Sequence, residues 1–273
     1  MNKQNDLLSA EKLWKTQMGG WFGAEQRVVY RGKDLFHELQ DHSWLKLLIF
    51  GVTGRELSTE QVALLDAAWV ICTSYPDPRL WNNRVAALAG TARSTASLAI
   101  SASTAVSEAT VYGHRAALLS MDFLQRTMQK KKIGINLEKI VEHELKSHKI
   151  ISGYGRPIPI EDERIQPLLK KAKKLGLDKG VYLRLALDVE NLLLKKHPRN
   201  FINAASLIAS LFADQGFSTR EYYHLSSLSF SAGISPCFIE ASEKPEGHFF
   251  PIRCERIEYR GIKQRQWKNR KIQ

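Results

Sequence analysis

Residues 84–106 read RVAALAGTARSTASLAISASTAV, and no other stretch constrains the architecture of this chain as strongly. Almost every position holds Ala, Ser, Thr or Gly, and the only leucine or isoleucine side chains are Leu88, Leu98 and Ile100. Small side chains let helix backbones approach one another closely. Because such a helix cannot form a core by itself, we expect it to lie between other helices or against a second subunit. An alanine-rich surface helix is the alternative, but a solvated helix would carry more charge.

Helix signals dominate the sequence on both sides of this segment. Residues 58–61 (STEQ) and 218–221 (STRE) form capping boxes, in which the serine hydroxyl and the glutamine or glutamate side chain bind amide groups that the first helical turn leaves unpaired. Apolar residues at helical spacing follow both boxes. Residues 168–175 and 182–194 place Leu, Val or Ala on one stripe and charged residues on the other, which predicts amphipathic helices.

Strand signals are scarce, with short alternating segments at residues 27–30 (RVVY) and 256–259 (RIEY). The chain of 273 residues is long enough to bury a substantial core, as one large domain or as two intertwined lobes. An apolar share of 44% and a charged share of 25% are typical of a folded globular protein. The sequence therefore predicts an all-α protein.

The cysteines and the apolar segments exclude several protein classes. Three cysteines, odd in number and far apart, do not form a disulfide framework or a zinc-binding pair: Cys72, Cys237 and Cys254. Residues 1–15 lack the continuous apolar run of a secretory signal. The most apolar stretch, residues 85–106, carries Arg93 and many hydroxyl side chains, so it is a poor membrane span. We therefore expect a cytoplasmic protein without a metal ion, a membrane partner or a permanently bound cofactor.

The formal net charge of +12 requires an explanation. Four basic clusters carry much of it: residues 130–132, 170–174, 195–199 and 260–271. A nucleic-acid surface is one reading, and capture of a phosphate-bearing ligand together with ordinary solvation is the other. The clusters are spread along the chain and no RNA-reading motif accompanies them, so nucleic acid is the less favoured partner.

A glycine turn in the middle of the chain is the clearest candidate for a ligand site. Gly153 and Gly155 flank Tyr154, and the following Arg156-Pro157 cannot continue a helix. Three basic residues lie close to this turn: Lys146, Lys149 and Arg164. A tight glycine loop between bases suits a phosphate-bearing ligand, although such a pair of glycines is often an ordinary turn.

Seven motifs occur in this order: RVVYRGKD at residues 27–34, GRELSTE at 54–60, the small-residue segment at 84–106, KIISGYG at 149–155, DER at 162–164, PRNFINAASLI at 198–208 and FSTRE at 217–221. Their order resembles the citrate synthase superfamily, and most closely the short citryl-CoA lyase form that also closes the ATP-citrate lyase chain. The corresponding family motifs include YRG, YGRLPTEEE, GxGHR, DPR, PNxxxNVDGLI and FTREE. The resemblance extends over nearly the whole chain, from about residue 27 to about residue 261.

The resemblance implies a citrate-synthase-like, all-α fold with a large helical lobe, a smaller helical lobe at approximately residues 125–230, and a cleft between them. Residues 1–26 would form an N-terminal arm and residues 27–273 the citrate-synthase-like domain. Members of the family are homodimers, and residues 84–106 would lie in the interface. The ligand would be coenzyme A or an acyl-CoA.

The family resemblance also implies residue roles. It assigns the binding of coenzyme A to five residues: Lys146, Lys149, Gly153, Tyr154 and Gly155. It assigns the substrate carboxylate to three arginines: Arg164, Arg253 and Arg256.

The residues that carry the family's chemistry are substituted. That chemistry is a Claisen-type condensation of acetyl-CoA with a 2-oxoacid, or the reverse cleavage, and it needs an aspartate base and several histidines. The aspartate falls on Ala205. The histidine of GxGH falls on Arg156, whose permanent charge prevents it from shuttling a proton near neutral pH. A second histidine falls on Tyr112, where lyase-type relatives also carry an aromatic residue.

Two further family groups are missing. A substrate-holding histidine belongs between residues 72 and 78, yet no histidine occurs between His42 and His114. The arginine expected near Phe230 is absent as well. His114 together with Tyr112 could replace the lost acid–base pair, although a structural histidine at a helix start is the simpler reading. Asp77 or Asp162 could replace the base, and nothing in the sequence selects either.

Three functions stay open from the sequence. The first is an acyltransferase or lyase of the citrate synthase type with an altered site. The second, which residue chemistry favours, is a non-catalytic relative that binds coenzyme A as a sensor or a regulatory partner subunit. The third is a nucleic-acid-binding helical protein, indicated by the charge and the basic C-terminal tail with Trp267.

Overall fold

The computed structural model describes residues 13, 15–110, 113–157, 161–248, 253–263 and 265. It begins with a small antiparallel sheet of β1 (Gly19–Phe22), β2 (Arg27–Tyr30) and β3 (Lys33–Asp34), joined in that order. Gly19 pairs with Tyr30, and Tyr30 pairs with Lys33. Part of the expected N-terminal arm is therefore a strand of this sheet.

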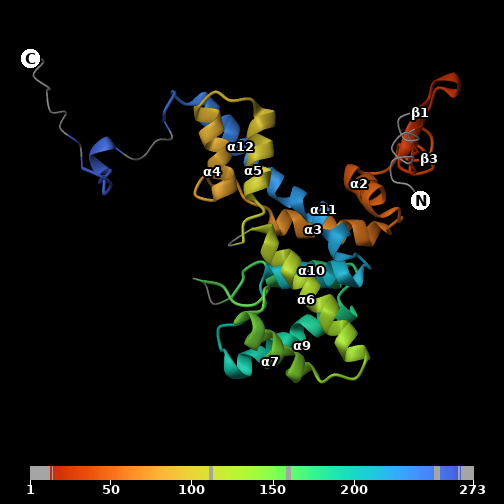
Figure 1. Cartoon of the computed structure of the whole chain (residues 1–273). Helices are drawn as coiled ribbons and strands as arrows, with labels where there is room; N and C mark the ends of the chain where they lie inside the picture. Colours follow the sequence, from red (N-terminus) through yellow and green to blue (C-terminus); the bar gives the residue numbers. More distant parts are fainter. Residues whose placement is uncertain are drawn as a thin grey trace, which may run out of the picture.

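Helices form nearly all of the remaining structure, which confirms the predicted fold class. They are α2 (Trp44–Thr53), α3 (Thr59–Cys72), α4 (Trp81–Thr91), α5 (Ala96–Val106), α6 (His114–Lys132), α7 (Leu137–His148), α8 (Ile165–Lys174), α9 (Val181–Lys196), α10 (Ala204–Asp214), α11 (Thr219–Ser226) and α12 (Ser231–Glu243), with short 3₁₀ turns η1 (Gly23–Glu25), η2 (Ser227–Phe230) and η3 (Cys254–Arg256). Figure 1 shows α4, α5 and α12 together at one end of the molecule, α3 and α11 in the middle, and α6, α7, α9 and α10 at the other end.

The local helix predictions are confirmed where the caps are strongest. Ser58 caps α3 and Ser218 caps α11, each in a complete capping box. The amphipathic segments predicted at 168–175 and 182–194 correspond to α8 and α9. The strand predicted at residues 27–30 is β2. The one predicted at 256–259 is wrong, because this exposed segment begins in the last residue of η3 and has no pairing partner among the described residues.

The small-residue segment is two helices rather than one. α4 ends at Thr91 and α5 begins at Ala96, and in the turn between them Arg93 has a left-handed φ of 59°. Thr95 starts α5 by accepting a hydrogen bond from the amide of Leu98. The Arg93 guanidinium donates to the carbonyls of Ser242 and Lys244, so it caps the C-terminal end of α12. The turn is thus fixed by a contact with a helix about 150 residues further along the chain, which the local composition does not reveal.

The small side chains of α4 have the predicted effect. A Cβ added at Gly90 would lie 2.5 Å from the carbonyl oxygen of Phe238 and 3.1 Å from Cβ of Ala241 in α12, so only glycine permits this approach. α4 therefore packs against both α5 and α12, as expected for a helix that cannot form a core alone.

The apolar core is divided unequally. A large cluster takes side chains from α2, α3 and α6 to α11, and its centre is α10, in which Leu207, Leu211 and Phe212 are at most 1% exposed. A second, much smaller cluster joins α4 to α12 through five residues: Ala86, Ala87, Ile234, Cys237 and Ala241. The predicted lobe boundary at residues 125–230 stays a prediction, since the large cluster also includes residues of α2 and α3.

Two arginines of the sequence motifs have structural roles. Arg31 adopts a φ of 49° and donates from Nε to the carbonyl of Gly51 at 2.6 Å, so it caps the end of α2 and fixes the sheet to it. Arg55 donates to the carbonyl of Gln215 at 3.0 Å and lies over the ring of Phe217. Both contacts join segments that are distant in sequence.

The basic clusters mostly occupy helix ends. Lys130–Lys132 form the last turn of α6, Lys171, Lys173 and Lys174 the last turn of α8, and Lys195 and Lys196 the last turn of α9. Cations stabilise a helix C-terminus through its partial negative charge. Much of the clustering therefore has an intrahelical explanation. In the described part of the chain, no helix is both long and apolar enough to span a membrane.

Candidate functional site

The glycine turn is built against the strand-like segment that leads into α10. Tyr154 forms an antiparallel bridge with Ile202, and the amide of Gly155 donates to the carbonyl of Phe201 at 2.7 Å. Asn203 holds both glycines of the turn. Its backbone amide donates to the carbonyl of Gly153 and its side-chain amide donates to the carbonyl of Gly155, both at 2.9 Å. Two motifs about 50 residues apart in sequence thus form one structure.

Both glycines of the turn are required by backbone geometry. Gly153 has a φ of 95° and Gly155 a φ of 77°, which side chains rarely allow. A Cβ at Gly153 would lie 2.6 Å from Cβ of Ser206. The close approach expected at this turn is therefore an approach to α6 and α10. Tyr154 points into the core, where its hydroxyl donates to the carbonyl of Ala186 at 3.0 Å, so only its backbone faces the turn.

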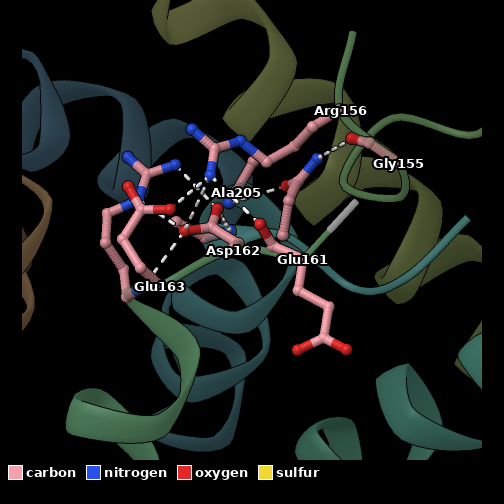
Figure 2. A network of polar contacts seen from close by, with 9 residues as sticks. Gly155, Arg156, Glu161, Asp162, Glu163 and Ala205 are labelled. Atoms are coloured by element: carbon pink, nitrogen blue, oxygen red, sulfur yellow. Dashed lines mark hydrogen bonds and ion pairs between the residues drawn. The ribbon is translucent and has the colours of Figure 1, made fainter. Parts of the chain in front are cut away.

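Asp162 lies at the centre of the polar network next to this turn (Figure 2). Its side chain is fully buried and accepts hydrogen bonds from Nε and Nη2 of Arg164 at 2.8 and 2.7 Å. It also accepts from the amide of Ala204, at the first residue of α10, at 2.9 Å. Arg156 approaches the same carboxylate at 3.8 Å and forms an ion pair with Glu163 at 2.5 Å. Figure 2 shows Ala205 beside this network.

The structure therefore brings together three positions that the family motifs single out: Arg156, Arg164 and Ala205. Ala205 stands in the first turn of α10, where its amide donates to the side chain of Asn203 at 3.0 Å. No ionisable group occupies this position. A carboxylate does lie close by, but it belongs to Asp162.

Asp162 is poorly suited to replace the missing base. Burial alone would raise the pKa of its carboxyl, but the hydrogen bonds from Arg164 and the Ala204 amide outweigh burial and hold the pKa below its usual range. A carboxylate with a lowered pKa and several bound donors has little tendency to accept a proton. Asp77, the other candidate, binds the guanidinium and amide of Arg79.

Lys146 and Lys149 lie at the C-terminal end of α7, directly before the glycine turn, and both are exposed. Lys149 adopts a φ of 63° as the cap residue of this helix. Glycine usually fills such a cap, and a lysine there costs of the order of 1 kcal/mol. The structure thus places two cations beside the turn, one of them at a strained position.

Two predicted arginines are not brought to the network. Arg253 and Arg256 lie on and beside η3, and both are exposed. Figure 1 shows this segment extending beyond α12, away from the other helices. Within one chain they do not meet Arg164. Tyr112, the remaining predicted position, lies outside the described residues.

Cys72 is a neighbour of the site that sequence reasoning missed. It ends α3, and burial raises the pKa of its thiol to about 11, while the charges of Arg164 and Asp162 act on it in opposite directions. Cys72 is the first residue of the stretch, residues 72–78, in which the family's substrate-holding histidine was expected. Its position in that stretch was the sequence signal that could have pointed to it. A thiol with a raised pKa stays protonated at neutral pH, so it cannot take over the role of an imidazole.

His114 occupies a sealed aromatic pocket. Its Nε2 lies 2.5 Å from Oγ of Ser226, and its ring stacks on Tyr223 with the centroids 5.4 Å apart. Phe230, near which an arginine was expected, packs against the same ring at 6.2 Å. His114 is only 2% exposed, and this burial lowers its pKa. These surroundings favour the structural reading of His114.

The described residues hold no group of three His, Cys, Asp or Glu side chains arranged to bind a metal. What the network offers chemically is a set of guanidinium and amide donors whose charges are largely matched by Asp162 and Glu163. Such donors recognise carboxylates or phosphates but do not transfer protons.

Comparison with known proteins identifies the fold that carries this network. No family model matches the sequence, and no curated protein matches it either. Among solved structures, citryl-CoA lyase from Hydrogenobacter thermophilus superposes with a TM-score of 0.81, over 94% of this chain and 98% of that one, at 19% sequence identity. ATP citrate lyase from Methanothrix soehngenii, solved with citrate and coenzyme A, superposes with a TM-score of 0.75 over 100% of this chain, at 18% sequence identity. This chain spans only 46% of that protein.

Citrate synthase from Thermoplasma acidophilum, solved with carboxymethyl coenzyme A and oxaloacetate, also superposes. The TM-score is 0.61, at 18% identity, over 83% of this chain and 59% of that one. At such identities a superposition shows the fold alone. The resemblance in the order of the sequence motifs is therefore confirmed at the level of the fold, and this chain has the citrate-synthase fold, matching citryl-CoA lyase over nearly its whole length.

Proposed function

We propose that this protein binds coenzyme A or an acyl-CoA beside the glycine turn and the N-terminus of α10, and that it does not catalyse the Claisen-type reaction. The observation that carries the proposal is the network around Asp162. It keeps the guanidinium groups of Arg156 and Arg164 beside the turn, with most of their charge matched by Asp162 and Glu163. At the position of the base it has the methyl group of Ala205.

The absence of catalysis follows from proton chemistry. Removal of an acetyl-CoA proton needs a positioned base, and loss of such a group typically lowers the rate by about two to four orders of magnitude. The rate losses from removing residues that act together are not additive, but the groups that only bind the substrate accelerate the reaction little by themselves. Asp162 is held ionised by Arg164, and Arg156 keeps its charge.

Binding of coenzyme A is supported by the cations before the glycine turn. Lys146 and Lys149 are exposed and free to reach phosphate groups from the end of α7. The strained backbone of Lys149 is expected where a side chain has a role that glycine cannot fill. Two superposing structures, of ATP citrate lyase and citrate synthase, were solved with coenzyme A or a derivative of it.

A homodimer completes the proposal. α5 contains no charged residue, and Leu98 and Ile100 on it are 61% and 40% exposed. On α12, Ile239 is 53% exposed. Exposed leucine and isoleucine side chains on a helix without charged residues are typical of an interface. We infer that α4, α5 and α12 pair with the same helices of a second copy.

Calorimetric titration with coenzyme A and acetyl-CoA tests the ligand. We expect binding to the wild type and a loss of about tenfold or more for Lys149→Glu, because one phosphate contact becomes a repulsion. Lys139→Glu is the matched control, since Lys139 is an exposed lysine near the opposite end of α7. Equal affinity in both variants would remove the proposed binding site, and no binding to the wild type would remove the ligand.

Turnover is tested separately. Thiol release is followed with acetyl-CoA and a panel of 2-oxoacids, and cleavage is followed with citryl-CoA. We expect no rate above the uncatalysed background with any of them. A rate that Arg156→Ala abolishes would contradict the non-catalytic proposal and favour an enzyme with altered chemistry.

A further inference from the structure

The two flanks of α3 carry hollows of different chemistry. Ala63, Asp66 and Val70 form the ridge between them, since each of these residues lines both hollows. The first hollow, of about 890 Å³, lies toward the start of α2 and the η2–α12 junction. The second hollow, of about 490 Å³, lies toward α8. Each volume falls in the range of about 300–1,000 Å³ that is usual for small-molecule sites.

The wall of the first hollow is largely aromatic and aliphatic. The indole rings of Trp44, at the start of α2, and of Trp69, on α3, line it together with Leu45, Val62 and Val70. Trp44 is 65% exposed, so much of its ring is open to a ligand. Within the described part of the chain, neither indole packs on another aromatic ring or has a basic side chain over its face. No internal cation therefore already occupies these rings.

Two carboxylates of the first hollow have no cation beside them. Asp41 and Asp66 are both exposed, and neither forms a hydrogen bond or an ion pair with a residue that the structure describes. Lys46, the one base among the described residues of this wall, has its Nζ 3.6 Å from Oε2 of Glu56. That ion pair offsets the charge of Lys46. The first hollow is therefore acidic, although the whole chain has a formal net charge of +12.

Some other polar groups of this wall are already engaged in the fold. The hydroxyl of Thr73 donates to the carbonyl of Ser229 at 3.0 Å, and the hydroxyl of Ser231 donates to the carbonyl of Leu228 at 2.6 Å. These bonds fix the η2–α12 junction against the end of α3. The charged groups that stay open to a ligand are therefore the two carboxylates.

An organic cation matches this combination of groups. An ammonium group is attracted to the face of an indole ring more strongly than to the ring of tyrosine or phenylalanine, and the attraction increases when water is displaced. Nearby carboxylates add to this attraction and repel an anionic ligand. The second hollow is less suitable, because three lysines of α8 line it beside Asp66: Lys170, Lys171 and Lys174.

We propose that the first hollow binds a small organic cation, in which an ammonium group is attached to an apolar or aromatic body. The ammonium group lies by Asp41, Asp66 and the ring of Trp44, and the body packs on Leu45 and Val62. Neither the glycine turn nor the residues of the Asp162 network line this hollow, so the site is separate from the proposed coenzyme A site. The two sites would take ligands of opposite charge.

Titration calorimetry of the full-length protein with phenethylammonium tests the site, with ligand-observed NMR as a second readout. We expect saturable binding with a Kd of about 1 mM or below. Phenethyl alcohol has the same ring without the charge and should bind about fivefold more weakly or less, and the anion phenylpropanoate should not bind. Asp66→Asn and Trp44→Ala should each lose about fivefold or more in affinity for phenethylammonium, because each removes one attraction for the cation.

Matched controls separate the site from general surface effects. Glu138→Gln removes an exposed carboxylate on α7, and Trp21→Ala removes an indole on β1 that is 76% exposed. Both controls should bind phenethylammonium like the wild type. Asp66 and Trp44 are exposed as well, so the thermal unfolding of their variants should match that of the wild type.

Three results would each overturn the proposal: no binding of phenethylammonium, equal affinities for the three probes, or losses in the control variants equal to those in the test variants. Light scattering without any probe covers one more occupant. A lower oligomer mass for Trp44→Ala than for the wild type would also overturn the proposal, because a second copy of the chain would then fill the hollow.

Discussion

Two groups of helices in this molecule reach stability by different means. α10 is surrounded by α6, α9 and their neighbours and is buried almost completely, with large side chains such as Leu211 and Phe212 inside. The layer of α4, α5 and α12 is held by alanines, Gly90 and one short cluster, and its leucine and isoleucine side chains lie largely outside.

The difference shows what each group requires. The first group buries many large apolar side chains, and burial contributes about 25 cal/mol per Å². The second gains close backbone contacts but little apolar burial, and its exposed face has no charge on α5 to keep it in water. The proposed dimer would therefore cover the exposed face of the second group.

The largest effect is expected at the centre of the first group. Phe212→Ala removes a ring that packs against Phe217 and Tyr222 at centroid distances of 5.2 and 5.0 Å. We expect a loss of about 3–5 kcal/mol in the free energy of unfolding, from lost burial and the cavity left behind. Urea denaturation measures it. A loss below about 1 kcal/mol would mean that this core is not the main source of stability.

The polar network attached to that core should matter next. Asp162→Asn weakens the hydrogen bonds from Arg164 and the Ala204 amide, and bonds to charged groups contribute about 1.5–3 kcal/mol. We expect a loss in that range at neutral pH by urea denaturation. Asp77→Asn, which affects only an exposed pair with Arg79, serves as the control and should change stability by less than about 1 kcal/mol.

The same variant has a signed pH dependence. The pKa of Asp162 is lower in the folded chain than in the unfolded chain, where it is about 3.9. The carboxylate therefore stabilises the fold above that pH, and the stabilisation is lost as the pH falls through the folded pKa. The stability difference between wild type and Asp162→Asn should shrink below about pH 4. A difference independent of pH would show that packing, not charge, explains the loss.

The turn beside the network should show a somewhat smaller effect. Gly153→Ala places a methyl group against Ser206 at a φ of 95°. We expect a loss of about 1–3 kcal/mol from backbone strain and overpacking. Gly134→Ala also has a positive φ but meets no atom within 4 Å, so it isolates the strain. Equal losses in the two variants, measured by thermal unfolding, would contradict a role for close packing at Gly153.

The smallest effect on the free energy of unfolding is expected from a substitution in the second group. The same substitution should have a large effect on dimer formation. Leu98→Asp changes a side chain that is 61% exposed on α5, so the monomer should lose less than about 0.5 kcal/mol. Light scattering should show the wild type as a dimer and the variant as a monomer at low micromolar concentration. Ile133→Asp, at the exposed residue that caps the C-terminal end of α6, is the control. A dimeric Leu98→Asp variant would place the interface elsewhere.

Local signals in the sequence were sufficient for much of the fold. Ser58 and Ser218 begin their helices because each capping box is formed within four residues. The order of the motifs predicted the citrate-synthase fold, and the superpositions confirm it. The prediction failed at Arg93, where one expected helix is divided in two. It also failed at residues 256–259, where a suitable alternation has no neighbouring strand.

The candidate site was predictable only in part. The proposed substitution of the family's base and imidazole, by Ala205 and Arg156, rests on the resemblance of the motifs alone. The ion pair of Arg164 with Asp162 could not be predicted from the motifs. It depends on the fold, which brings donors from the start of α8 and the start of α10 to one carboxylate. The inward direction of Tyr154 and the neighbourhood of Cys72 likewise depend on packing between distant segments.

The sequence by itself determined the helix starts and the small-residue segment, because each depends on residues that are close together in the chain. The tertiary structure decided which charges neutralise one another, which glycine meets which helix, and which apolar faces stay exposed. Those properties arise from contacts between residues far apart in sequence, whose distances only the folded chain fixes.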